Sequence, residues 1–198
     1  MLSTSNMGIA ISLTFCCFLA ATQEVNSTQK SQPAALFREL QLPDATDQAT
    51  QQMLDLAQSD STVRPYLAKR LPKMVEMNPY RSFSVWRNEV RLAGELKIAE
   101  AAPALAKWIA VTGDEGIGTP LPSALETSPA AKALSQIGNP AVPALKSKLA
   151  GGKWQERRLA ILVCQAIGSP SAQDALRQHL SGEPDPDLRS LAERTIRR

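Results

Sequence analysis

Hydrophobic residues recur along this chain at the spacing of amphipathic helices, and one arrangement of them occurs twice in succession. The first copy holds Ile137-Gly138-Asn139-Pro140, then Ala144-Leu145 and Leu149; the second holds Ile167-Gly168-Ser169-Pro170, then Ala175-Leu176 and Leu180. In each copy an apolar helix ends at Gly, a turn containing Pro follows, and a second short helix begins. The pattern therefore predicts a helical hairpin that is repeated along the chain, with Leu145 and Leu176 on the buried face.

A third, looser copy precedes these two. Leu96 takes the position of Ile137 and Ile167, and Ala104-Leu105 with Ile109 matches Ala144-Leu145 with Leu149. The distance from Leu96 to Ile137 is 41 positions, against 30 from Ile137 to Ile167. An inserted Gly- and Pro-rich loop, Thr112 to Ser123, accounts for the longer interval.

The same periodicity predicts the remaining helices. They are Ala34–Leu40, Ala45–Gln58, a helix opening at Ser61, Ser84–Ile98, Ala101–Val111, Glu126–Ile137, Ala141–Ala150, Trp154–Ile167, Ala172–Ser181 and Asp187–Arg197. Pro72 should kink or split the helix that contains it, because an internal proline removes a hydrogen bond and clashes with the preceding turn. Trp86 and Trp154, at helix starts, are expected to pack between hairpins.

Composition supports an all-α fold. Of the 198 residues 43% are hydrophobic and only 5% aromatic, which suits helix packing better than strands, where aromatic and β-branched residues are enriched. The net charge of +3, without a dense Lys/Arg block, gives no reason to expect a nucleic-acid partner.

The N-terminus has the pattern of an export signal. Met7 to Ala21 is almost unbroken in its apolar character, and the polar stretch Thr22 to Gln32 follows. We expect residues 1–22 to be a signal peptide, 23–33 a polar linker and 34–198 the folded domain, in a secreted or periplasmic protein. The segment before Met7 has no Lys or Arg, so an uncleaved anchor is the alternative.

Candidate catalytic residues are few. Cys164 remains alone after removal of the signal, which excludes an intramolecular disulfide, and its apolar surroundings favour a buried core residue. His179 is the one histidine, so a multi-histidine metal site is excluded and a Cys164–His179 pair is the one nucleophile–base option. We expect no cofactor and no metal.

Several segments resemble HEAT repeats of the phycobilin-lyase-like subclass. The resemblance rests on Gly94-Glu95-Leu96-Lys97-Ile98, Ala102-Pro103-Ala104-Leu105, Asp187-Leu188-Arg189 and the run from Ile137 to Leu145, and it covers Ser61 to Arg198. It implies an α-α superhelix, a HEAT- or armadillo-like solenoid of about four hairpins. It also implies a protein-binding role, with the bilin-attaching lyases as the enzymatic exception.

The second helices of the hairpins carry matched polar positions. One residue beyond Leu105, Leu145 and Leu176 stand Ala106, Lys146 and Arg177; three residues beyond stand Trp108, Lys148 and His179. Because second helices line the concave side of HEAT-like solenoids, Trp108, Lys146, Lys148, Arg177 and His179 are the predicted partner-binding residues. The alternative is that the lysines form the solvated face of an amphipathic helix.

Two functions therefore remain open. The first is an exported, non-enzymatic scaffold that binds a protein or peptide partner, with acidic side chains suited to the basic surface. The second is a bilin-lyase-like or other enzyme on the same scaffold. The expected export and the lack of a catalytic constellation favour the first, with no membrane contact beyond the export signal.

Overall fold

The computed structural model describes residues 33–42, 47–112 and 124–197. Throughout these ranges the chain is helical, without a strand, which confirms the all-α prediction. The expected signal peptide, nearly all of the linker and most of the loop predicted at 112–123 lie outside the described residues.

The helices follow one another with short connections. In chain order they are residues 33–39, α2 (Asp47–Ser59), α3 (Val63–Ala68), α4 (Leu71–Glu76), α5 (Phe83–Glu95), α6 (Ala102–Lys107), α7 (Ala124–Thr127), α8 (Pro129–Ile137), α9 (Val142–Gly151), α10 (Trp154–Ile167), α11 (Pro170–Leu180) and α12 (Pro186–Ile196). Single 3₁₀ turns precede α5, α6 and α9; they are η1 (Pro79–Arg81), η2 (Ala99–Ala101) and η5 (Asn139–Ala141).

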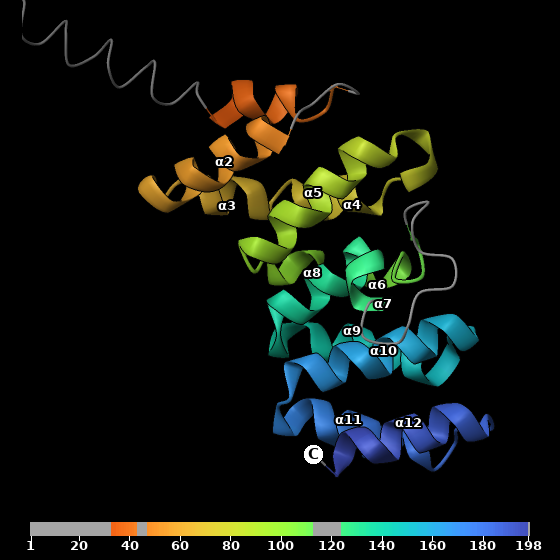
Figure 1. The fold of residues 1–198 in the computed structure, drawn as a ribbon. Coiled ribbons are helices and arrows are strands. Elements are labelled where there is room, and N and C mark those ends of the chain that lie inside the picture. Colours follow the sequence, from red (N-terminus) through yellow and green to blue (C-terminus); the bar gives the residue numbers. More distant parts are fainter. Residues whose placement is uncertain (1–32, 43–46, 113–123, 198) are drawn as a thin grey trace, which may run out of the picture.

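These helices form two rows (Figure 1). In the first row α2 contacts α5, α5 contacts α8, α8 contacts α10 and α10 contacts α12. In the second row α4 contacts α6, α6 contacts α9 and α9 contacts α11. The 33–39 helix and α12 lie at opposite ends of the molecule.

The core lies between the two rows. The three matched leucines Leu105, Leu145 and Leu176 have no exposed surface, as the spacing predicted. Their helical neighbours Ile109 and Leu149 are buried as well. The apolar stripe of each second-row helix therefore faces the first row.

The first-row helices α5, α8 and α10 are each followed by a residue with positive φ. Lys97, Gly138 and Gly168 follow the last turn at matched positions, with φ of 52°, 79° and 63°. At Lys97 the N–H of Ile98 bonds to the carbonyl of Ala93 and the N–H of Lys97 to that of Gly94, which is a Schellman cap. A side chain at positive φ is unfavourable. Lys97 is therefore strained at this position, whereas Gly138 and Gly168 are not.

Proline sets two helix boundaries, only one of which was expected. Pro72 lies in the first turn of α4, and the chain breaks before it between α3 and α4. The single helix predicted over Glu126–Ile137 is wrong, because it is divided into α7 and α8 at Ser128. A residue that precedes proline avoids the α conformation, and Ser128, before Pro129, is extended and caps α8 by accepting from the N–H of Ala131.

Two further expectations need correction. The helix predicted over Ala101–Val111 ends at Lys107, because Trp108 leaves the helical conformation. Trp86 is buried and donates its indole N–H to the carbonyl of Val75, as a packing residue should. Trp154 is 45% exposed, with the guanidinium of Arg158 5.5 Å from its ring centre, so it does not pack between hairpins.

Candidate functional site

The five predicted partner-binding residues lie on or directly after α6, α9 and α11, which are neighbours in the second row. Their side chains nevertheless differ in what they contact. Two are directed into the fold, one is held against a neighbouring helix end, and two are exposed.

Trp108 is held against the end of α4. Its indole N–H donates to the carbonyl of Glu76 at 3.2 Å, and Lys107 lies 5.3 Å above its ring. The side chain is half-buried and packs against the core. Trp108 therefore joins α6 to α4, which leaves only part of its ring for a partner.

Lys148 points away from the second-row surface, toward the start of α10. Its ammonium lies 2.7 Å from Glu156, and both side chains are about four-fifths buried. Burial alone would raise the pKa of Glu156, but the charge and hydrogen bond of Lys148 and the backbone N–H of Lys153 lower it. This ion pair fastens the α9–α10 connection.

His179 belongs to a buried polar network at the end of α11. Its Nε2 lies 2.7 Å from Oε2 of Glu183, with the N–H direction off the line of an aligned hydrogen bond. Arg157 from α10 binds Glu183 through two hydrogen bonds of 2.9 and 3.1 Å. Burial lowers the pKa of His179, the charge of Glu183 opposes that shift, and Arg157 adds to it. The imidazole is therefore neutral at pH 7.

Lys146 and Arg177 are the two exposed members of the set. Arg177 pairs with Asp174, one turn earlier on α11, at 2.5 Å. Lys146 has no carboxylate within ion-pair distance among the described residues. Its charge is thus available at the surface.

A hollow of about 370 Å³ lies between α9 and α11. It is lined by Lys146, Leu149, Ala150, Ala175, Gln178, His179, Ser181 and Gly182. Of the predicted residues, the structure brings Lys146 and His179 together here, while Trp108, Lys148 and Arg177 do not line this hollow. Gln178 and Ser181 were not predicted, although both lie within one helical turn of His179.

The Arg157–Glu183 pair was missed because the two residues are 26 positions apart and no repeat links them. Glu183 alone could have been found, since it is four residues after His179, a spacing at which side chains meet on a helix or its end.

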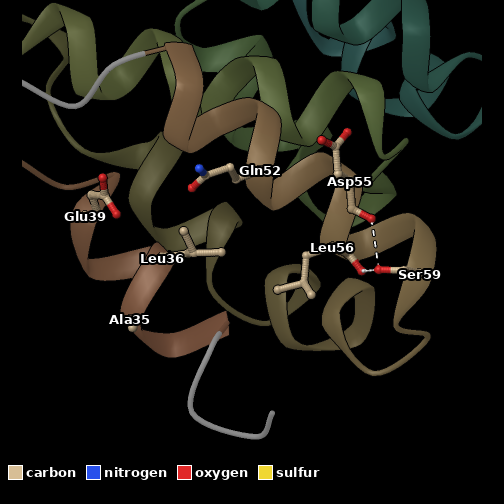
Figure 2. Close-up of a pocket in the computed structure, with 7 residues that line it drawn as sticks. All are labelled: Ala35, Leu36, Glu39, Gln52, Asp55, Leu56 and Ser59. Carbon is tan, nitrogen blue, oxygen red and sulfur yellow. Dashed lines mark hydrogen bonds between the residues drawn. The ribbon is translucent and has the colours of Figure 1, made fainter. Parts of the chain in front are cut away.

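A second, larger hollow lies at the other end of the molecule (Figure 2). It has a volume of about 610 Å³ and separates the 33–39 helix from α2. We call this hollow the N-terminal groove. Its lining consists of Ala35, Leu36, Glu39, Gln52, Asp55, Leu56 and Ser59. The sequence patterns gave no indication of this groove.

The described residues contain one cysteine, Cys164. Cys164 is buried in α10, and burial raises the pKa of its thiol to about 12, so it is a core residue rather than a nucleophile. Within the three described ranges no cluster of three or more His, Cys, Asp or Glu side chains could hold a metal ion. In the same ranges no helix has the length and apolar character to cross a membrane.

Comparison of the chain with protein-family models, with curated proteins and with solved structures finds no match.

Proposed function

We propose that this protein is an exported, non-enzymatic α-solenoid of HEAT-like hairpins that binds an acidic segment of a protein partner. The binding surface is the second row, centred on the hollow between α9 and α11. The observation that carries the proposal is that this hollow joins an exposed lysine, Lys146, to apolar and amide side chains contributed by two successive second-row helices.

The arrangement of the helices supports the solenoid part of the proposal. Each helix contacts the next in its own row, and three first-row helices are followed at matched positions by a residue with positive φ. Repeat proteins bind partners over the extended surface that such a succession of helices provides. The resemblance to HEAT repeats rests on α5 with α6, on α8 with α9 and on the start of α12.

The lining of the hollow indicates the chemistry of the partner. Leu149, Ala150 and Ala175 give it an apolar wall, Gln178 offers an amide and Lys146 an unneutralised cation. His179 is nearly enclosed and neutral, so Lys146 supplies the positive charge. An aspartate or glutamate next to a small apolar residue fits this surface.

A photo-crosslinking amino acid in place of Gln178, which lines the same hollow and leaves Lys146 intact, tests the proposal. Expressed in the native cell, this variant should cross-link to one discrete protein, whereas the same probe at Lys132, on α8 in the first row, should not. Lys146→Glu, combined with a probe at Gln178, should abolish the adduct because an acidic partner is then repelled. Equal labelling from positions 132 and 178 would contradict the proposed surface.

Export is tested separately by N-terminal sequencing of the protein from its native compartment. Cleavage should leave a first residue between about Ala20 and Glu24, where small residues follow the apolar run. Recovery of the uncleaved chain from the cytosol would disprove export and leave the partner-binding surface untouched.

A further inference from the structure

The N-terminal groove combines an apolar floor with two carboxylates. Leu36 and Ala35 come from the 33–39 helix and Leu56 from α2, while Glu39 and Asp55 stand on the two different helices that border the groove (Figure 2). A groove of this kind suits an amphipathic helix that presents a cation beside apolar side chains.

Neither carboxylate is neutralised within the described part of the chain. Glu39 makes no side-chain hydrogen bond or ion pair there, and Asp55 accepts only from the amide of Gln51, at 3.0 Å, and from no cation. Arg38 is next to Glu39 in sequence but does not line the groove. Two exposed negative charges therefore border an apolar surface.

The opposite end of the molecule carries the complementary chemistry. Arg194 on α12 donates to the neutral hydroxyl of Ser190, and Arg189 donates to the carbonyl of Glu183. Arg197, directly after α12, is 78% exposed and lies 3.4 Å from Glu193. At the end of α12, Arg194 and Arg197 thus stand beside one carboxylate, Glu193, whereas Asp185 and Asp187 lie at its start.

α12 also retains apolar surface. Leu191 and Ile196 pack against the core but are only half-buried, because among the described helices none covers their outer side. At the other end, α2 and the 33–39 helix likewise have no preceding neighbour in the described chain. One end of the described stack thus has the carboxylates of Glu39 and Asp55 beside the groove, and the other has Arg194 and Arg197 beside the exposed part of α12.

We infer that α12 of a second copy docks in the N-terminal groove, so that copies of this chain associate head to tail. The two ends of one molecule are at opposite extremes of the stack, so α12 cannot reach the groove of its own chain. The contact joins two different surfaces and is therefore heterologous; it produces a ring if the rotation between copies closes, and an open chain of copies otherwise. The inference does not depend on the proposed partner surface.

The test is the solution mass of the mature protein as its concentration is raised. Between about 10 and 300 μM, the range in which weak interfaces associate, the weight-average mass should rise above that of the monomer. It should fall back in about 1 M salt, where the Debye length is about 3 Å.

Charge reversal identifies the surfaces. Glu39→Arg with Asp55→Arg reverses the groove, and Arg194→Glu with Arg197→Glu reverses α12. Each double variant should weaken self-association at least about tenfold, through like-charge contacts. All four changes in one chain, or an equimolar mixture of the two double variants, should restore it, because opposite charges face each other again.

Two controls separate docking from general effects. Lys132→Glu with Lys146→Glu changes the net charge as much as the α12 reversal, away from both ends, and should leave self-association intact while Lys146→Glu abolishes partner capture. Ala35→Trp fills the groove and should prevent association in an otherwise unchanged chain. A wild-type protein that stays monomeric, reversals without effect, or a fourfold variant that is folded and still monomeric would each overturn the inference.

Discussion

Leu145 and Leu176 are completely buried, although each is followed directly by an exposed cation, Lys146 or Arg177. The two leucines fill the same position in successive second-row helices and contact the first row from the same side. In each pair the leucine therefore stabilises the core while the next residue is exposed at the surface, because successive side chains of a helix point about 100° apart.

Replacing either leucine with alanine should destabilise the protein by about 2–5 kcal/mol, since a large buried side chain leaves a cavity. Denaturant unfolding of Leu145→Ala and Leu176→Ala measures this loss. The neighbouring exchanges Lys146→Ala and Arg177→Ala are the matched controls and should stay within about 0.5 kcal/mol of wild type, as surface changes do. A leucine variant as stable as its control would place that leucine outside the core.

Glu89 on α5 lies in an environment that is unfavourable for a charged carboxylate. It is buried, one of its carboxylate oxygens has no hydrogen-bond partner, and burial raises its pKa to about 7. The folded protein therefore holds a proton that the unfolded chain releases near pH 4.5. Stability should decrease as pH rises from about 4.5 to 7 and level off above that, because the charged form must then be buried.

Glu89→Gln removes this titration. The variant should gain stability over wild type on going from pH 4 to pH 8, by up to about 3 kcal/mol from the shift of 4.5 to about 7 at 1.36 kcal/mol per unit. The lowered pKa of His179 has the opposite pH dependence, with stability lost as pH falls below about 6.5. It is the same in both proteins and cancels in the difference. A pH-independent difference would show that Glu89 is solvated.

At the scale of the elements, the ends of α5, α8 and α10 show what a repeat preserves. All three require a positive φ after the last turn, and glycine meets this requirement at Gly138 and Gly168. Lys97 meets it with a side chain, which costs of order 1 kcal/mol or more.

Lys97→Gly should therefore stabilise the protein by about 0.5–1 kcal/mol, the strain relieved less the added freedom of glycine in the unfolded chain. Gly168→Ala should do the reverse at the equivalent position. Thermal unfolding of the two variants side by side is the measurement. A loss of stability in Lys97→Gly would mean that the lysine side chain makes a contact worth more than the strain.

Gly94 allows α5 and α8 to approach closely. A Cβ at this position would lie 2.8 Å from the Cα of Ala133 and 2.9 Å from its Cβ. Alanine is the better helix former by about 1 kcal/mol, but here it would force the two helices apart.

Gly94→Ala should consequently destabilise the protein by about 1–3 kcal/mol, the usual cost of overpacking. Chemical denaturation measures the change, and Ala133→Gly in the same chain should recover part of it by removing the opposing methyl group. A stabilised Gly94→Ala variant would indicate that helix propensity outweighs packing at this contact.

The element boundaries also show how far the sequence could predict the fold. Periodicity located α10 at its observed bounds and α9, α11 and α12 within one or two residues. It missed the break at Ser128, since the apolar spacing runs on through Pro129 and only the proline itself marks the boundary. Trp154 was predicted to pack between hairpins because it stands at a helix start, whereas the structure leaves it 45% exposed in the first turn of α10, beside Arg158.

At the scale of the whole molecule, the repeat in the sequence aligned the second-row helices correctly. It could not show which of the matched side chains are exposed and which bind a carboxylate. Lys148 and His179 fit the pattern as well as Lys146 does, yet they turn toward Glu156 and Glu183. Both carboxylates belong to other elements, and their positions depend on tertiary packing. The N-terminal groove was missed for a related reason: it lies between helices that precede the recognisable repeats.

One hydrogen bond joins the end of the α6 segment directly to the start of α8, across the residues that connect them in sequence. The hydroxyl of Ser128 donates to the carbonyl of Ile109 at 2.7 Å, across 19 positions. It ties the end of the α6 segment to the start of α8 on either side of residues 113–123. Because this contact holds the two ends of the interval together, a change in the length of the chain between them acts on the entropy of closing it.

An insert of about 19 residues between Gly116 and Ile117 would double the 19 positions from Ile109 to Ser128 and should cost about 0.6 kcal/mol in closure entropy. Ser128→Ala should cost more, about 1–3 kcal/mol, because it leaves the buried carbonyl of Ile109 unsatisfied. Unfolding curves of both variants test this order. A reporter or a second domain inserted between α6 and α8 should therefore leave the packing of both rows unchanged.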